Sequence, residues 1–101
     1  MKHVFFRLLP PRANFVQTMT AAEAELMDRH AAYWKDLMDA GQVVAYGLGL
    51  VADPQSFYGV GILQLADDTN ADALVRNDPT IKAHVGFHFE IFPMPRAVLR
   101  T

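Results

Sequence analysis

Residues 20–41 constrain the fold of this chain most strongly, because their sequence predicts a single amphipathic helix. Residues of a helix advance by about 100° each, so side chains three, four and seven positions apart share one face. The apolar face of the predicted helix consists of Leu26, Met27, Tyr33, Trp34, Leu37 and Met38. Thr20-x-x-Glu23 predicts a capping box at its start, and Gly41 predicts a left-handed end. Such a helix has to pack its apolar face against another element.

His30 lies in the middle of this apolar face. Buried polar groups are usually satisfied by hydrogen bonds, so His30 could be a structural residue of the core. A partly buried imidazole could equally act as an acid/base, because histidine needs only small shifts to titrate near neutral pH. The residues alone leave both alternatives open.

The composition is that of a globular domain, and it argues against several classes of partner. Of the 101 residues, 51% are hydrophobic and 20% are charged, which predicts a single domain over residues 1–101. The net charge of -2, without a run of Lys or Arg, argues against nucleic acid or an anionic membrane as a partner. No cysteine is present, which excludes disulfides and thiolate chemistry. No segment has the length of a signal peptide or membrane span, so we expect a cytoplasmic protein.

Strands are predicted on both sides of the long helix, from runs of branched and aromatic residues. The predicted strands are residues 2–9, 42–51, 57–66 and 84–92. Pro10 ends the first strand and Pro93 the last, because proline has no N–H to donate to a sheet. The short turn at residues 52–56 requires its two flanking strands to be antiparallel.

A second, shorter helix is predicted over residues 67–77, with Thr69 at its N-cap. Pro79 ends this helix, since the residue before a proline is pushed out of the helical region. A turn at residues 80–83 follows. Residues 10–19 form a loop that could act as a lid, although we favour an ordinary surface loop. The order β-α-β-β-α-β is that of the α+β ferredoxin-like fold, an antiparallel sheet with both helices on one face.

Alternation along the outer segments sorts their side chains onto the two faces of this sheet. The face under the helices is predicted to carry Val4, Phe6, Leu8, Val85, Phe87, Phe89 and Ile91. The opposite face is predicted to carry His3, Phe5, Arg7, Leu9, His84, Gly86, His88, Glu90 and Phe92. This second face is too aromatic to lie bare in water and too polar for a dry core. We favour a homodimer that covers it over a solvated face with scattered aromatics.

Two motifs suggest a cofactor or a metal, and neither fits its predicted context. The segment from Gly47 to Ala52 loosely matches a dinucleotide fingerprint, but a turn and a strand follow it where a helix is required. His84 and His88 suggest a zinc pair, yet four residues of strand would separate them by roughly 13 Å. We therefore expect neither a cofactor nor a metal site.

Four further segments, taken together, resemble a known family. They are His30-Ala-Ala-Tyr33-Trp34, Leu37-Met-Asp-Ala-Gly41, Asn77-Asp78-Pro79 and Phe89-Glu-Ile91-Phe-Pro93. In this order they resemble the YCII-related domain family over nearly the whole chain. The resemblance implies a ferredoxin-like fold that dimerises into an α/β barrel. It also implies a histidine/aspartate pair in a small-molecule pocket, which maps onto His30 and Asp78.

In such a pair the carboxylate fixes the histidine tautomer and leaves the second ring nitrogen to move a proton. Candidates for contact with a ligand are Tyr33, Trp34, Arg7, Arg12 and His88. Some members of the family resemble dehydrochlorinases of chlorinated hydroxyquinones, and muconolactone isomerase is a more distant structural relative.

Three functions are compatible with these features. The first is a cofactor-free enzyme in which His30 and Asp78 catalyse elimination or isomerisation of a small cyclic or aromatic molecule. The second is a module that binds or senses a small ligand without turnover. The third is a structural dimer in which the two residues only connect the helices. We favour the first.

Overall fold

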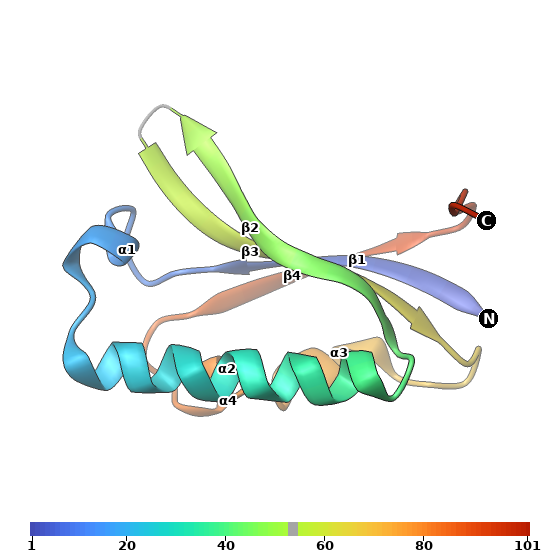
Figure 1. Cartoon of the computed structure of the whole chain (residues 1–101), viewed down its shortest axis with the longest axis horizontal. Coiled ribbons are helices and arrows are strands. Elements are labelled where there is room, and N and C mark those ends of the chain that lie inside the picture. Colours follow the sequence, from blue (N-terminus) through green and yellow to red (C-terminus); the bar gives the residue numbers. More distant parts are fainter. Residues whose placement is uncertain (53–54) are drawn as a thin grey trace.

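The computed structural model describes residues 1–52 and 55–101, and within them a four-stranded sheet carries helices on one face (Figure 1). The strands are β1 (Lys2–Leu9), β2 (Val43–Ala52), β3 (Gln55–Leu65) and β4 (His88–Met94). They lie in the order β2-β3-β1-β4, and β1 pairs antiparallel with both β3 and β4. The ferredoxin-like fold predicted from the order of elements is confirmed.

The helices are α1 (Phe15–Thr18), α2 (Ala21–Asp39), α3 (Ala71–Arg76) and α4 (Pro79–Lys82). The last three lie along one face of the sheet, below it in Figure 1. The short α1 lies at one end of the molecule, where the far ends of β2 and β3 rise away from α2 (Figure 1). This arrangement leaves one end of the sheet covered less completely than its middle, and two β2 side chains there, Leu48 and Leu50, are exposed.

The long helix begins and ends as its sequence predicts. The Thr20 hydroxyl accepts from the Glu23 N–H at 3.1 Å, and the Thr20 N–H donates to the Glu23 carboxylate at 2.9 Å. This reciprocal pair is the predicted capping box. Gly41 has a φ of +82°, which a residue with a Cβ adopts only at a cost.

The core lies between α2, α3 and the centre of the sheet. Its buried members include Val4, Phe6, Trp34, Val43, Leu63, Leu65, Ala71 and Val75. Trp34 is 1% exposed and stacks on Phe6 with ring centroids 4.6 Å apart. The Phe6 ring occupies the space where a Cβ on Gly61 would lie, so this glycine serves packing. A second cluster, of Leu8, Phe15, Leu26 and Phe87, lies toward α1.

The second predicted helix begins later than residue 67. It is capped by Asn70, whose side chain accepts from the Ala73 N–H at 3.2 Å. The predicted cap, Thr69, is wrong, because its own N–H donates to the Ala66 carbonyl at 3.0 Å in the preceding turn. The turn predicted at residues 80–83 is also wrong in part, since α4 begins at Pro79, a favoured first position of a helix.

The last strand begins four residues later than predicted, at His88. His84 and Gly86 have φ values of +54° and +102°, so the chain is not extended there. Gly86 also packs so closely on Pro11 that an added Cβ would lie 2.9 Å from the proline side chain. Val85 is consequently 50% exposed instead of buried under the helices, and neither His84 nor Gly86 belongs to the opposite face.

Pro93 does not end β4, which continues to Met94 with Pro93 opposite Val4 of β1. The strand lies at the edge of the sheet, where the missing N–H of proline is tolerated. Of the predicted turn at residues 52–56, Asp53 and Pro54 lie outside the described residues. Among the described helices, none is long and apolar enough to cross a membrane.

Candidate active site

The side chains of His30 and Asp78 meet between α2 and the start of α4, although 48 residues separate them in sequence. His30 Nδ1 lies 2.6 Å from Asp78 Oδ2. The Asp78 side chain is 1% exposed and the His30 side chain 15% exposed. A carboxylate this deeply buried has to be compensated by hydrogen bonds or charge.

Asp78 receives that compensation on both of its oxygens. Oδ2 accepts from Trp34 Nε1 at 2.5 Å in addition to His30. Oδ1 accepts from the Thr80 N–H at 2.8 Å and from the Thr80 hydroxyl at 2.7 Å. Burial by itself raises the pKa of Asp78, but the hydrogen bond and charge of His30, with the bonds from Trp34 and Thr80, hold that pKa below its usual value. The carboxylate is therefore ionised at neutral pH.

The ionised carboxylate determines which nitrogen of His30 carries a proton. A carboxylate only accepts hydrogen bonds, so His30 Nδ1 is the donor. In the neutral imidazole Nε2 is then an acceptor, and it makes no hydrogen bond within residues 1–52 and 55–101. Nε2 is thus available to take a proton.

His30 also lines a cavity of about 320 Å³. The other lining residues are apolar or aromatic: Leu8, Pro10, Phe15, Val16, Met19, Met27, Ala31, Tyr46, Gly47, Leu48, Phe57, Tyr58, Gly59 and Phe87. Volume and lining are those of a small-molecule site, which is typically apolar with few polar groups. A larger hollow of about 940 Å³ lies near both chain termini, and its lining includes neither His30 nor Asp78. We therefore place the candidate site in the smaller cavity.

Tyr33 and Trp34 lie beside the pair but do not line this cavity. The Tyr33 hydroxyl donates to the Leu74 carbonyl at 2.7 Å, connecting α2 to α3. Burial, and next the negative charge of Asp78, raise the pKa of Tyr33, which keeps its hydroxyl protonated. Trp34 acts on the site through Asp78.

Arg7 and His88 do not line the cavity, although Arg7 lies near the lining residue Tyr58. Arg7 forms an ion pair with Glu90 on the neighbouring strand. Its guanidinium also lies 5.6 Å from the centroid of the Tyr58 ring and 5.9 Å from that of Phe92. His88 is exposed at the start of β4. Neither Arg7 nor His88 is among the cavity-lining residues.

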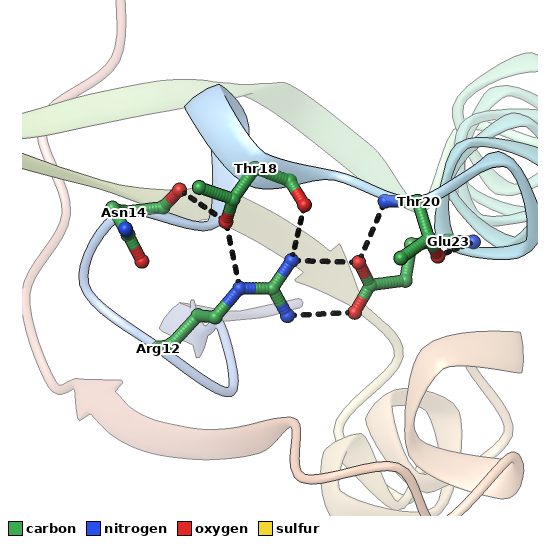
Figure 2. A network of polar contacts seen from close by, with 5 residues as sticks. All are labelled: Arg12, Asn14, Thr18, Thr20 and Glu23. Atoms are coloured by element: carbon green, nitrogen blue, oxygen red, sulfur yellow. Dashed lines mark hydrogen bonds and ion pairs between the residues drawn. The ribbon is translucent and has the colours of Figure 1, made fainter.

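Arg12 is held in a network that joins the region of α1 to the start of α2 (Figure 2). Its guanidinium donates to both Glu23 oxygens, at 2.7 and 2.8 Å, and to the hydroxyl and carbonyl of Thr18, both at 2.8 Å. The hydrogen bonds from Arg12 and from the Thr20 backbone lower the pKa of Glu23 to about 2. Four of the five N–H donors of Arg12 are thus bound within the protein itself.

A family model described as the YCII-related domain matches residues 3–95. The chain belongs to the YCII-related family. No sequence match to a curated protein was found.

Several solved structures are similar to this YCII-related chain at low identity. The 5-chloro-2-hydroxyhydroquinone dehydrochlorinase of Burkholderia phenoliruptrix AC1100, solved with 2,5-dihydroxybenzoquinone, is 20% identical with a TM-score of 0.56; the match covers 86% of this chain and 90% of that chain. A dimeric ferredoxin-like protein of unknown function from Thermobifida fusca YX is 16% identical, TM-score 0.45, over 92% of both chains. A formyltetrahydrofolate deformylase from Pseudomonas putida KT2440 is 11% identical, TM-score 0.45, over 91% of this chain and 28% of that chain.

The residues of this YCII-related domain that sequence reasoning missed are the apolar walls of the cavity. Phe15, Val16 and Met19 come from α1 and the residue that follows it, a segment predicted to be a loop. Val16 and Met19 follow Phe15 by one and four positions, a spacing typical of one face of a helical turn. This spacing is the sequence signal from which the wall could have been predicted. Phe15 packs edge-on against Phe87 with centroids 5.3 Å apart, which fixes this wall to the sequence just before β4.

Proposed function

We propose that this protein is an enzyme that catalyses elimination or isomerisation of a small cyclic or aromatic molecule, with His30 as the acid/base and no cofactor. One observation carries the proposal: His30 lines an apolar cavity of about 320 Å³, and its Nδ1 is bound to a buried carboxylate at 2.6 Å. A general acid/base that is oriented by a carboxylate and lines a small-molecule cavity is the minimum arrangement for proton transfer.

The chemistry follows from the two ring nitrogens. Nε2 removes a proton from a ring C–H or O–H of the ligand, and the Asp78 carboxylate stabilises the imidazolium that forms. In an elimination, the electron pair of that bond forms a new double bond while a leaving group such as chloride departs. In an isomerisation, the imidazolium returns the proton to a different carbon. Both reactions are balanced without any further reagent.

The dehydrochlorinase that shares the fold adds support, because loss of hydrogen chloride is an elimination of this class. At 20% identity the likeness concerns the fold, so the proposal rests on the site geometry. A panel of hydroxylated and chlorinated rings, including 5-chloro-2-hydroxyhydroquinone, tests it directly. We expect product with wild type and with His88→Asn, and none with His30→Asn, which keeps a donor toward Asp78 but cannot take a proton.

Binding without turnover is the second candidate. Among the described residues that line the cavity, His30 is the single polar side chain other than tyrosine. One such group is enough to recognise a ligand, whereas many reactions use more, and this favours binding alone. Ring compounds that bind wild type at the cavity and are all recovered unchanged would select this candidate.

We also propose that a second copy of the chain covers the face of the sheet opposite the helices. Phe5 and Phe92 lie together on that face with ring centroids 5.7 Å apart, and Phe92 is 42% exposed. The Arg7–Glu90 pair lies beside them. A paired charge surrounded by aromatic rings is typical of an interface in which aromatic residues and Arg predominate.

A further inference from the structure

We infer that the cavity at His30 accepts uncharged ring compounds and rejects carboxylates of the same size. This inference rests on the proposed function in one respect, that the cavity is the ligand site. It is carried by the distribution of charge around the cavity. Among the described residues that line it, there is no Lys, Arg, Asp or Glu. A carboxylate that enters such a site loses its hydration and gains no cation, which is costly.

Three arginines lie close in sequence to cavity-lining residues. Arg29, next to His30, is exposed and lines a different hollow, while Arg7 and Arg12 are bound to other groups of the protein. The guanidinium of Arg12, three residues before the wall residue Phe15, donates to Glu23 and Thr18 (Figure 2). It also lies 5.2 Å from the centroid of the Phe15 ring. Arg7, which precedes the lining residue Leu8, is paired with Glu90. Recruiting either one for a ligand would break an existing ion pair.

Lys35 is a further cation on α2, four residues after the lining residue Ala31. The hydrogen bond to Asp39, and next the negative charge of that carboxylate, raise the pKa of Lys35. Its ammonium is bound to Asp39 at 3.0 Å, one turn further along α2. Lys35 is therefore also paired within the protein, and it is 68% exposed, where water screens its charge.

The His30–Asp78 pair itself does not supply a positive charge. With a neutral imidazole the pair carries a charge of −1, and with an imidazolium it carries a charge of zero. In neither state is the pair a net cation. An uncharged hydroxyl can donate to Nε2 in the first state, whereas a carboxylate would meet a negatively charged pair.

The size of the cavity limits the ring compound further. An engineered protein cavity of about 150 Å³ binds benzene. The cavity here, of about 320 Å³, is about twice that volume, so it accommodates one substituted ring or two fused rings. The inferred ligand is thus a small, uncharged, mostly apolar ring with one hydrogen-bonding group directed at His30.

Methyl 2,5-dihydroxybenzoate and 2,5-dihydroxybenzoate are suitable probes, because they share a ring and two hydroxyls and differ in charge. Calorimetry at neutral pH measures the affinity of each. The methyl NMR signals of Met19 and Met27, which line the cavity, report where each binds, and Met1 and Met94 serve as references. We expect the ester to bind at least about tenfold more tightly than the carboxylate and to shift the signals of Met19 and Met27.

A charge-switch variant makes the test specific to the cavity. Leu48 lines the cavity and is 66% exposed, so Leu48→Arg adds a cation at the rim without burying it. We expect Leu48→Arg to shift the ester-to-carboxylate ratio toward the carboxylate by at least about tenfold. Leu99→Arg places the same change on the C-terminal segment, at a residue 40% exposed that does not line the cavity, and should leave the ratio unchanged.

Two results would overturn the inference: equal or tighter binding of the carboxylate to wild type at Met19 and Met27, or no shift of these signals by either probe. The outcome is separable from that of the proposed function. If wild type prefers the ester but converts no ring compound, the inferred selectivity stands and the proposed enzymatic function fails. If wild type converts carboxylates and His30→Asn abolishes the reaction, the proposed enzymatic function stands and the inferred selectivity fails.

Discussion

The indole N–H of Trp34 donates to the Oδ2 atom of Asp78 at 2.5 Å, and this is the same oxygen that His30 Nδ1 approaches to 2.6 Å. Trp34 and His30 lie one helical turn apart on α2, so one helix face presents both donors to one carboxylate. Asp78 in turn caps α4 through Thr80. The site and the helix packing therefore share a single buried anion.

Trp34→Phe tests the contribution of the indole donor. The ring keeps its place on Phe6, while Asp78 loses a charge-assisted hydrogen bond. We expect a loss of about 2 kcal/mol in the free energy of unfolding, measured with denaturant. Tyr33→Phe removes a neutral hydrogen bond to the Leu74 carbonyl and should cost less, about 1 kcal/mol. Equal stability of wild type and Trp34→Phe would show that this bond contributes little.

The tautomer of His30 is a second expectation. The neutral imidazole should carry its proton on Nδ1, because ionised Asp78 can only accept. Nitrogen-15 chemical shifts of the ring atoms measure this directly, and the exposed side chains of His84 and His88 serve as references in the same spectrum. A His30 ring protonated on Nε2 would be incompatible with the pair as described.

Acid should weaken the fold through Glu23. The pKa of Glu23 is about 2 in the folded chain against 4.5 for the free group, so the folded state favours the ionised form. Its contribution to stability is therefore complete above about pH 4.5 and is lost as the pH falls toward 2. Unfolding measured across this range should show a shallower pH dependence in Glu23→Gln than in wild type. Glu25→Gln, on an exposed position of the same helix, is the control.

The proposed dimer predicts a hydrodynamic mass of about twice 11.3 kDa. Phe5→Glu places a charge next to Phe92 on the proposed interface and should yield the monomer, because an unpaired charge in an interface is costly to desolvate. Val98→Glu adds the same charge at a residue 93% exposed and should not change the mass. A wild-type protein that remains monomeric at micromolar concentration in sedimentation velocity would contradict the proposed dimer.

Much of the fold could be predicted from local sequence, because its signals are local. The capping box at Thr20 and the left-handed Gly41 each involve residues within one helical turn. The late start of β4 was missed because it depends on a contact far along the chain. Gly86 is left-handed and packs against Pro11, so an alternating sequence there does not form a strand.

The site was less accessible to sequence reasoning. His30 stands out on an apolar face, but its partner Asp78 is 48 residues away and was assigned through the family resemblance. Arg7 and Arg12 were candidates for ligand contact because an unpaired arginine can hold an anion. Their partners, Glu90 and Glu23, are evident only once the strands and helices are in place. The cavity walls come from segments spread over much of the chain, and only the part formed by Phe15, Val16 and Met19 has a local pattern.

The central claim is that His30 transfers a proton in the cavity. On the first ring compound that wild type converts, kcat/KM should fall by at least about 100-fold in His30→Asn, the usual range for loss of a general acid/base. The same substitution at exposed His88 should leave kcat/KM within about twofold of wild type, since His88 does not line the cavity. A folded His30→Asn protein that retains wild-type kcat/KM would contradict the account.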